Sequence, residues 1–205
     1  MLIKVCGMRD DKNISELLEL QPDYMGMIFF SKSPRFVGTH ASKVQKERYA
    51  HTQKVGVFVN EDDRFIWDMI NEFGLDMIQL HGHETPEQCE RFHKEIPVIK
   101  AFSIANAEDL KATSFYEGTA DLFLFDTKTP GYGGSGLKFD WNLIKEANIG
   151  TDFLLSGGIG EDDIDLVKSL EIPRMIGIDL NSKFEVSPAF KDIAKLQNTF
   201  IRIRE

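Results

Sequence analysis

The sequence predicts an α/β protein folded as a single (β/α)8 TIM barrel with parallel strands. Eight short β-rich segments alternate along the chain with amphipathic stretches that are each about one helix long. The strand segments are near-continuous apolar runs, as in Met25–Phe30 and Leu122–Phe125, which is typical of parallel strands covered on both faces. An open doubly wound sheet is the alternative, but it would carry a GxGxxG turn after its first strand, and residues 6–10 do not supply one.

The expected strands recur at regular intervals. They are Leu2–Cys6, Tyr24–Phe30, Lys54–Val59, Met77–His81, Val98–Phe102, Asp121–Asp126, Asp152–Ser156 and Met175–Asp179. Residues that favour helix N-termini mark the start of the helices between them. These N-caps are Thr39, Asn60, Thr85 before Pro86, Asn106, Asp140, and Ser187 before Pro188.

The helix expected after Gly160 shows why these segments need a sheet. Acidic residues 161–163 suit the positive N-terminus of a helix. Ile164, Val167 and Leu170 then fall on one face, which is buried only by packing against a sheet.

Length and composition favour one domain over residues 1–205. The apolar fraction of 42% is enough for a buried core, and no linker or composition break divides the chain. The net charge of −9 and the pI near 5.1 argue against a nucleic-acid partner, because binding phosphates in a duplex needs clustered Lys and Arg.

Cysteine usage and the lack of a long apolar run indicate a cytoplasmic protein. Cys6 and Cys89 lie far apart and form no CxxC, so we expect no disulfide and a reducing compartment. The first residues are charged too soon for a signal peptide, and no run approaches the ~20 residues of a membrane span. We therefore expect no membrane partner, while the oligomeric state stays open.

In a barrel of this kind the active site lies at the C-terminal ends of the strands. Asp126 ends an apolar strand and enters a loop with four glycines, followed by a helix that Asp140 would cap. A carboxylate there is either a catalytic acid or base, or a cap for the loop, and we favour the catalytic role. The other residues expected at the same mouth are Cys6, the loop after Phe30, His81, Ser156–Gly158 and Asp179–Ser182.

Two segments have the composition of a phosphate site. Gly157 and Gly158 follow the seventh strand, and Asn181 and Ser182 follow the eighth, where this fold commonly binds phosphate. Glycine lets peptide N–H groups approach an anion without a Cβ in the way. A tight turn is the alternative for the glycine pair.

Cys6, Arg35 and Asp179 each have a functional and a structural interpretation. Cys6 ends a strand before a glycine, but a free cysteine is more often a packing residue. Arg35 lies in a loop stiffened by Pro34, where its guanidinium could grip a carboxylate or simply be solvated. Asp179 is interpreted as a support residue at the mouth.

His81, His83 and Glu84 form only a weak metal motif. A strand end would splay the two histidines, and no further His or Cys cluster completes a ligand shell. We therefore predict no metal site.

Eleven short segments spread along the chain match the sequence pattern of a known family. They are Lys4–Gly7, Gly26–Phe29, Lys32–Val37, Lys54–Asn60, Ile78–Glu84, Phe125–Asp126, Gly133–Gly136, Phe139–Trp141, Ser156–Ile159, Gly177–Glu185 and Lys191–Asp192. Together they resemble the phosphoribosylanthranilate isomerase family of tryptophan biosynthesis, in order and over nearly all 205 residues.

The resemblance implies an Amadori rearrangement of N-(5-phosphoribosyl)anthranilate to 1-(2-carboxyphenylamino)-1-deoxyribulose 5-phosphate, without metal or organic cofactor. Asp126 matches the family's general acid, which protonates the ring oxygen, and Cys6 matches the general base, which takes the C2′ proton. Arg35 matches the residue that holds the anthranilate carboxylate. The loops with Gly157, Gly158, Asn181 and Ser182 match the phosphate grip.

Two positions depart from the family pattern. Ala189 follows Pro188 where the family usually has glycine, and Asn181 stands where many members have serine. Because alanine disfavours positive φ, we expect a local change at the start of the last helix.

Other functions remain to be weighed. An indole-glycerol-phosphate synthase would need an inward lysine and glutamates, and a ribulose-phosphate epimerase would need metal-binding His and Asp. A non-catalytic phosphosugar sensor would bind without turnover. A dual-substrate isomerase would carry an aspartate where this chain has Cys6.

Overall fold

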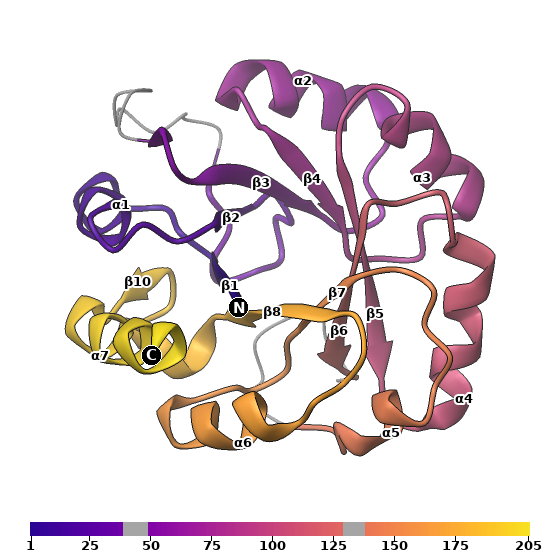
Figure 1. Ribbon diagram of the computed structural model, residues 1–205. Coiled ribbons are helices and arrows are strands. Elements are labelled where there is room, and N and C mark those ends of the chain that lie inside the picture. Colours follow the sequence, from indigo (N-terminus) through magenta and orange to yellow (C-terminus); the bar gives the residue numbers. More distant parts are fainter. Residues whose placement is uncertain (39–48, 129–137) are drawn as a thin grey trace.

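The eight expected strands close into a parallel barrel. The computed structural model describes residues 1–38, 49–128 and 138–205 (Figure 1). Strands β1 to β8 follow one another around the barrel in chain order, and β8 pairs with β1 to close it. The predicted (β/α)8 fold with parallel strands is confirmed.

The strand bounds agree with the sequence prediction to within a few residues. They are β1 Leu2–Cys6, β2 Tyr24–Ile28, β3 Gln53–Phe58, β4 Met77–Leu80, β5 Val98–Ile104, β6 Leu122–Thr127, β7 Phe153–Leu155 and β8 Met175–Leu180. A small antiparallel hairpin, β9 Glu185–Ser187 and β10 Phe190–Lys191, lies outside the barrel sheet.

In the described residues, helices follow every strand of the barrel except β2 and cover the outer face of the barrel (Figure 1). The α-helices are α1 Asp11–Leu18, α2 Asp63–Phe73, α3 Pro86–His93, α4 Ala107–Leu110, α5 Asn142–Lys145, α6 Ile164–Ser169 and α7 Ile193–Arg204. The 3-10 turns are η2 Lys111–Tyr116, η3 Glu161–Asp163 and η4 Ser182–Phe184. Within the described ranges, no helix is long and apolar enough to cross a membrane.

Several predicted helix starts are confirmed. Thr85 and Asn106 are N-caps whose side chains accept hydrogen bonds from Gln88 N and Glu108 N. The segment after Gly160 begins with η3 and continues as α6, with Ile164 buried against the core.

Other predicted helix starts are wrong or displaced. Asn60 has a φ of 54° and precedes α2, which Asp62 caps instead, because a left-handed residue turns the chain before the helix begins. Asp140 accepts a hydrogen bond from Asn142 N at 3.0 Å, but the residue at the N-cap is Trp141. Thr39 lies outside the described residues.

Ser187 does not cap the last helix. It ends β9, and α7 begins after Asp192, whose side chain accepts a hydrogen bond from Lys195 N at 3.0 Å. Ala189 therefore lies in the hairpin turn and not at the helix start. It adopts a φ of 66°, so the departure from glycine leaves an alanine in a conformation that costs it free energy.

Alternation along the strands separates two layers of side chains. Outward residues such as Ile3, Phe123 and Phe153 join the large core between sheet and helices. Inward residues such as Leu122 and Leu124 fill the barrel interior with apolar side chains. Continuing the same alternation toward the C-terminal strand ends puts polar residues on the inward face.

A buried ion pair ties the loop after β4 to β5. Lys100 Nζ contacts Glu84 Oε2 at 2.7 Å and also donates to the carbonyls of Leu80 and Gly82, and both charged side chains are at most 2% exposed. Glu84 in turn accepts hydrogen bonds from Asn60 N and Gly82 N. This network fixes the loop that carries His81.

We predict that Glu84→Ala lowers the free energy of unfolding by about 3 to 5 kcal/mol, because it leaves Lys100 buried without its counter-charge. Urea denaturation measures the change. The exposed pair of Lys111 and Glu108 serves as the control, since Glu108→Ala should change stability by no more than about 0.5 kcal/mol. Equal small effects of both substitutions would contradict the assigned importance of the buried pair.

Candidate active site

The C-terminal mouth of the barrel collects polar side chains from five strands. Their alternation on the strands places them on the inward face with the apolar interior layer beneath. They are Lys4 and Cys6 of β1, Gln79 of β4 with the adjoining His81, Asp126 of β6, Ser156 after β7, and Asp179 of β8. The sequence predictions for Cys6, His81, Asp126 and Asp179 thus fall on neighbouring parts of one mouth.

Cys6 is held in a confined position. An ideal Cβ built on Gly26 of β2 would lie 2.7 Å from Cys6 Sγ, so glycine is required opposite the thiol. Burial raises the pKa of the Cys6 thiol, and Asp179 raises it further, whereas Lys4 and Lys191 act in the opposite direction. The thiol is buried and free, and three charged groups, Lys4, Asp179 and Lys191, act on it.

Asp126 keeps its proton to a higher pH than an ordinary aspartate. Its Oδ1 accepts a hydrogen bond from Thr127 N at 2.8 Å, and its Oδ2 lies 3.5 Å from His81 Nε2. Burial raises the pKa of Asp126 to about 6, with Asp179 adding to the rise. A carboxyl group with this pKa suits general acid catalysis.

The His81–Asp126 contact is not an ion pair at neutral pH. Burial, together with Lys100 and Lys4, lowers the pKa of His81 to about 4, so the imidazole is neutral. Gln79 Nε2 lies 2.8 Å from His81 Nδ1, and with the amide as donor the imidazole proton is on Nε2, facing Asp126. A protonated His81 would lower the pKa of Asp126, whereas the neutral imidazole does not.

Arg35 lies in a loop that folds back beside β2. Val37 N donates to Ile28 O at 2.9 Å, and Arg35 N donates to Ser33 Oγ at 3.1 Å. The Arg35 guanidinium is not solvated, because Nε and Nη2 bind Glu185 Oε1 and Oε2 at 2.9 and 2.7 Å. This fork uses the Nε and Nη2 edge of the guanidinium, and within the described part of the chain no hydrogen bond engages Nη1.

Lys191 shares the Glu185 carboxylate with Arg35. Its Nζ lies 2.6 Å from Glu185 Oε1 and 2.8 Å from Asn181 Oδ1, and its side chain has no exposed area. Two buried cations thus face one carboxylate, which leaves excess positive charge beside Asn181. Burial raises the pKa of Glu185, but the hydrogen bonds from Arg35 and Lys191 prevail and lower it overall.

The two predicted phosphate loops are adjacent. An ideal Cβ on Gly160, in the loop after β7, would lie 3.7 Å from Lys183 Cβ in the loop after β8. Gly157 and Gly158 have φ values of 92° and 70°, and a Cβ on Gly157 would lie 2.4 Å from Thr127 Oγ1. Glycine at 157 is thus needed for close packing on the end of β6, next to Asp126.

The weak metal motif is dispersed by the fold. His81 faces Asp126, Glu84 binds Lys100, and His83 N donates to Asn60 Oδ1. Among the described residues, no three His, Cys, Asp or Glu side chains are grouped so as to hold a metal ion.

Sequence reasoning missed Lys4, Gln79, Glu185 and Lys191 as members of this site. Lys4 and Gln79 carried a usable signal, since each is a polar residue at an inward position of an apolar strand. Glu185 and Lys191 sit in a hairpin whose fold the sequence did not predict.

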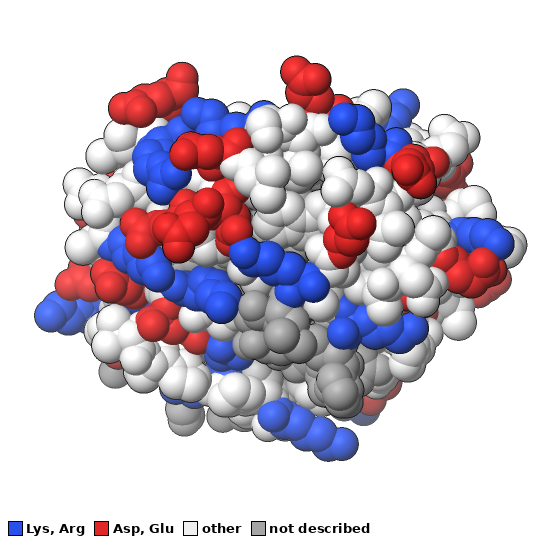
Figure 2. Space-filling model, turned by 90° about the horizontal axis from the view of Figure 1, so that it is seen from below, with Lys and Arg blue, Asp and Glu red and all other residues white. Residues whose placement is uncertain are grey.

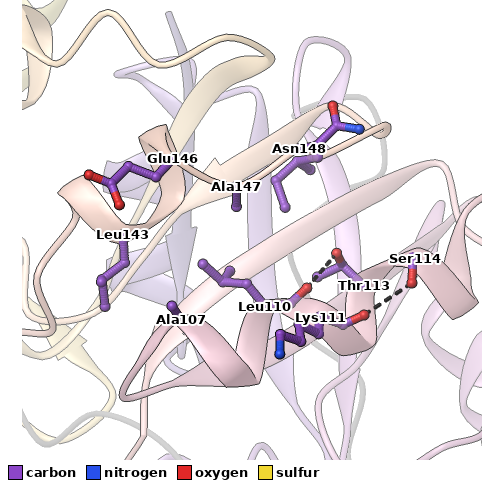
Figure 3. Close-up of a pocket in the computed structure, with 10 residues that line it drawn as sticks. Ala107, Leu110, Lys111, Thr113, Ser114, Leu143, Glu146, Ala147 and Asn148 are labelled. Atoms are coloured by element: carbon purple, nitrogen blue, oxygen red, sulfur yellow. Dashed lines mark hydrogen bonds between the residues drawn. The ribbon is translucent and has the colours of Figure 1, made fainter.

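A separate hollow of about 420 Å³ lies outside the barrel wall, between α4 with η2 on one side and α5 with the residues after it on the other (Figure 3). Its lining includes the apolar Leu110 and Leu143 and the charged Lys111 and Glu146. The molecular face viewed from below shows Lys and Arg interspersed with Asp and Glu and not gathered into one basic patch (Figure 2).

The fold and this site define an enzyme-like (β/α)8 barrel with a thiol and a protonatable carboxyl group at one mouth. Residues 3–202 match the family model described as N-(5'phosphoribosyl)anthranilate (PRA) isomerase. The chain belongs to this family.

Relatives and solved structures agree. An N-(5'-phosphoribosyl)anthranilate isomerase from Parabacteroides distasonis is 45% identical over 97% of this chain and 91% of the relative. The crystal structure of a phosphoribosyl anthranilate isomerase from Thermus thermophilus has a TM-score of 0.82 at 26% identity, covering 100% of this chain and 98% of the other. Another solved isomerase, in complex with reduced 1-(o-carboxyphenylamino)-1-deoxyribulose 5-phosphate, has a TM-score of 0.76 at 26% identity, with coverage of 100% and 98%.

We predict that Asp126→Asn stabilises the protein at neutral pH. The folded pKa of about 6 exceeds the ordinary value of 3.8, so the stability contributed by protonated Asp126 is complete below pH 4 and is lost as the pH rises to about 6. A difference near two pKa units corresponds to about 2 to 3 kcal/mol at pH 7.5. Urea unfolding should show this gain at pH 7.5 and little difference at pH 4.

The control for this prediction is Asp68→Asn, at a side chain that is 63% exposed. In urea unfolding, the difference in stability between Asp68→Asn and the unmodified protein should be the same at pH 4 and at pH 7.5. A stability of Asp126→Asn equal to or below that of the unmodified protein at pH 7.5 would show that Asp126 is not held in an unfavourable charged state.

Proposed function

We propose that this chain is the isomerase that converts N-(5-phosphoribosyl)anthranilate to 1-(2-carboxyphenylamino)-1-deoxyribulose 5-phosphate in tryptophan biosynthesis. Membership of the family and the likeness to an isomerase solved with a reduced form of that product support the reaction. The observation that carries the mechanism is a carboxyl group with a pKa of about 6 at the same mouth as a thiol whose ionised form Lys4 and Lys191 favour.

In the first step, Asp126 donates its proton to the furanose ring oxygen. The C1′–O bond breaks, its electron pair goes to the protonated oxygen, and the amine nitrogen supplies the pair that forms the C1′=N bond. Asp126 ends as a carboxylate, which the neutral His81 Nε2–H faces. General acid catalysis of this kind contributes ~100 to 10,000-fold.

In the second step, the Cys6 thiolate takes the C2′ proton. The C–H electron pair forms the C1′=C2′ bond, the C1′=N pair returns to nitrogen, and the thiolate becomes a thiol. The enolamine then gains a proton at C1′ and loses one from the C2′ hydroxyl to give the ketone. Proton transfers account for the whole isomerisation, so the proposal requires no metal or organic cofactor.

Substrate binding is divided among the surrounding loops. The free Nη1 edge of Arg35 suits the anthranilate carboxylate, and the excess positive charge shared with Lys191 favours an anion there. The adjacent loops with Gly157, Gly158, Asn181 and Ser182 suit the phosphate. His81 and Asp179 support the acid and the base.

We further propose that residues 1–205 form one catalytic domain in the cytoplasm. The two buried free cysteines suit a reducing compartment. The partner that we propose for this chain is its small-molecule phosphoribosyl substrate, and we propose no nucleic-acid partner.

Substituting either proton-transfer residue should abolish most turnover. Asp126→Asn keeps the shape without a transferable proton, and Cys6→Ser replaces the thiol by a much weaker acid, so each should lower kcat by ~100-fold or more in steady-state assays. The control Cys89→Ala, at a buried cysteine of α3, should keep kcat. Near-normal kcat in folded Cys6→Ser or Asp126→Asn would refute the mechanism.

Arg35→Ala should mainly weaken binding. Losing a charge-assisted hydrogen bond costs about 1.5 to 3 kcal/mol, which corresponds to a fall in kcat/KM of roughly 10- to 150-fold. A substrate analogue that lacks the carboxylate provides the control, because the variant and the unmodified enzyme should then differ little. If Arg35→Ala impairs both substrates equally, Arg35 only supports the fold.

Inorganic phosphate should inhibit competitively by occupying the loops after β7 and β8. Gly157→Ala should weaken this inhibition, because its Cβ would collide with Thr127 Oγ1. Gly118→Ala is the matched control, since Gly118 also has positive φ but has open space around its Cβ position. Unchanged phosphate inhibition in Gly157→Ala would move the phosphate site elsewhere.

A further inference from the structure

We infer that the buried pair of Lys4 and Asp179 beneath Cys6 controls how readily the thiol ionises, with Lys4 favouring the thiolate and Asp179 opposing it. Lys4 and Asp179 are thus positioning residues that act through Cys6. The inference rests on the proposed role of Cys6 as the general base and identifies the groups that tune that base.

The register of the barrel creates this pair. Strands β1 and β8 are neighbours in the barrel (Figure 1). Lys4 and Cys6 are two residues apart on β1 and point to the same side, and Lys4 lies opposite Asp179 of β8 in the register. Lys4 Nζ contacts Asp179 Oδ1 at 2.9 Å, and the two side chains are 0% and 6% exposed. Ser156 Oγ donates to Asp179 Oδ2 at 3.2 Å, so both carboxylate oxygens are engaged.

Asp179 keeps the buried ammonium charged. Burial alone would lower the pKa of Lys4, but the charge of Asp179 and the hydrogen bond to it prevail, and the pKa is raised overall. The charge of Lys4 also lowers the pKa of the Cys6 thiol, which lies on the same face of β1. A buried, charged ammonium group held by Asp179 therefore lies on the same face of β1 as the thiol that must become an anion.

The surroundings of Cys6 offer few other means of stabilising a thiolate. On β2 and β3 the neighbours are Ile28, Val57 and the confined Gly26, which carry no charge. Lys191 of β10 is the second cation that lowers the thiol pKa, but Glu185 and Asn181 already engage its Nζ. Among these groups Lys4 has the largest favourable effect on the thiolate, and Asp179 has the opposing one.

The test is the pH dependence of Cys6 alkylation by iodoacetamide, measured by mass spectrometry of the Cys6 peptide. Only the thiolate reacts, so the midpoint reports ionisation of Cys6 without reference to turnover. Lys4→Met should raise the midpoint by about 1 to 3 pH units, because Asp179 then faces the thiol without its counter-charge. Adding Asp179→Asn to Lys4→Met should reverse part of that rise.

The midpoint pH of alkylation should be lowest in the unmodified protein, higher in the double variant and highest in Lys4→Met. If the pair only supported the fold, adding Asp179→Asn to Lys4→Met should shift the midpoint further from that of the unmodified protein. If the pair acts through its charges, adding Asp179→Asn should shift the midpoint part of the way back. If Lys4→Met does not fold, the double variant carries the test, since it should still lie above the unmodified protein. Glu84→Gln, in the buried pair outside the barrel, should leave the midpoint unchanged.

Midpoints that coincide in all these proteins, or a double variant shifted further than Lys4→Met, would overturn the inference. Kinetics distinguishes this failure from failure of the proposed function. Each unit of rise in the midpoint should lower kcat/KM about tenfold with little change in phosphate inhibition. If Cys6→Ser retained its kcat, the base assignment would fail while the alkylation result could still stand.

Discussion

The inward alternation of side chains on closed parallel strands is the constraint on which the rest of this molecule depends. Leu122 and Leu124 fill the interior of β6, and the next inward residue is Asp126; on β1 the inward residues are Lys4 and Cys6. Because the barrel closes, these strand ends surround one mouth. The apolar layer below excludes water from the base of the mouth, so every charge there acts in a medium of low polarity.

Burial gives the titratable groups of the mouth unusual but complementary protonation states. His81 is neutral, with a pKa of about 4, while Asp126 retains its proton up to about pH 6. The lysines that discourage a charge on His81 are the same kind of group that favours an anion at Cys6. Such an arrangement is costly for stability and useful for the proposed catalysis, since the carboxyl group of Asp126 and the thiol of Cys6 are both in position before substrate binds.

The strands and the mouth followed from sequence because their signals are local. Apolar runs located all eight strands, and Cys6, His81, Asp126 and Asp179 were found simply as the polar residues at strand ends. Partnerships across the barrel had no such signal: the pairing of Lys4 with Asp179 depends on the register of β1 on β8. The sequence predicts a helix start where the hairpin with Glu185 and Lys191 lies, because Ser187 before Pro188 resembles an N-cap. Ala189 adopts positive φ in the turn, but alanine is not a residue from which a left-handed turn would be predicted.

The most direct measurement is the pH profile of kcat/KM. In the proposed mechanism, the active form needs Asp126 protonated and Cys6 ionised, although the thiol has the higher pKa. The account predicts a tenfold rise per pH unit up to about pH 6, a plateau, and a fall above the thiol pKa. In the residual activity of Asp126→Asn the break near pH 6 should be absent, and the rise should continue toward the thiol pKa. A profile with no change of slope near pH 6, or one that Asp126→Asn leaves unaltered, would contradict it.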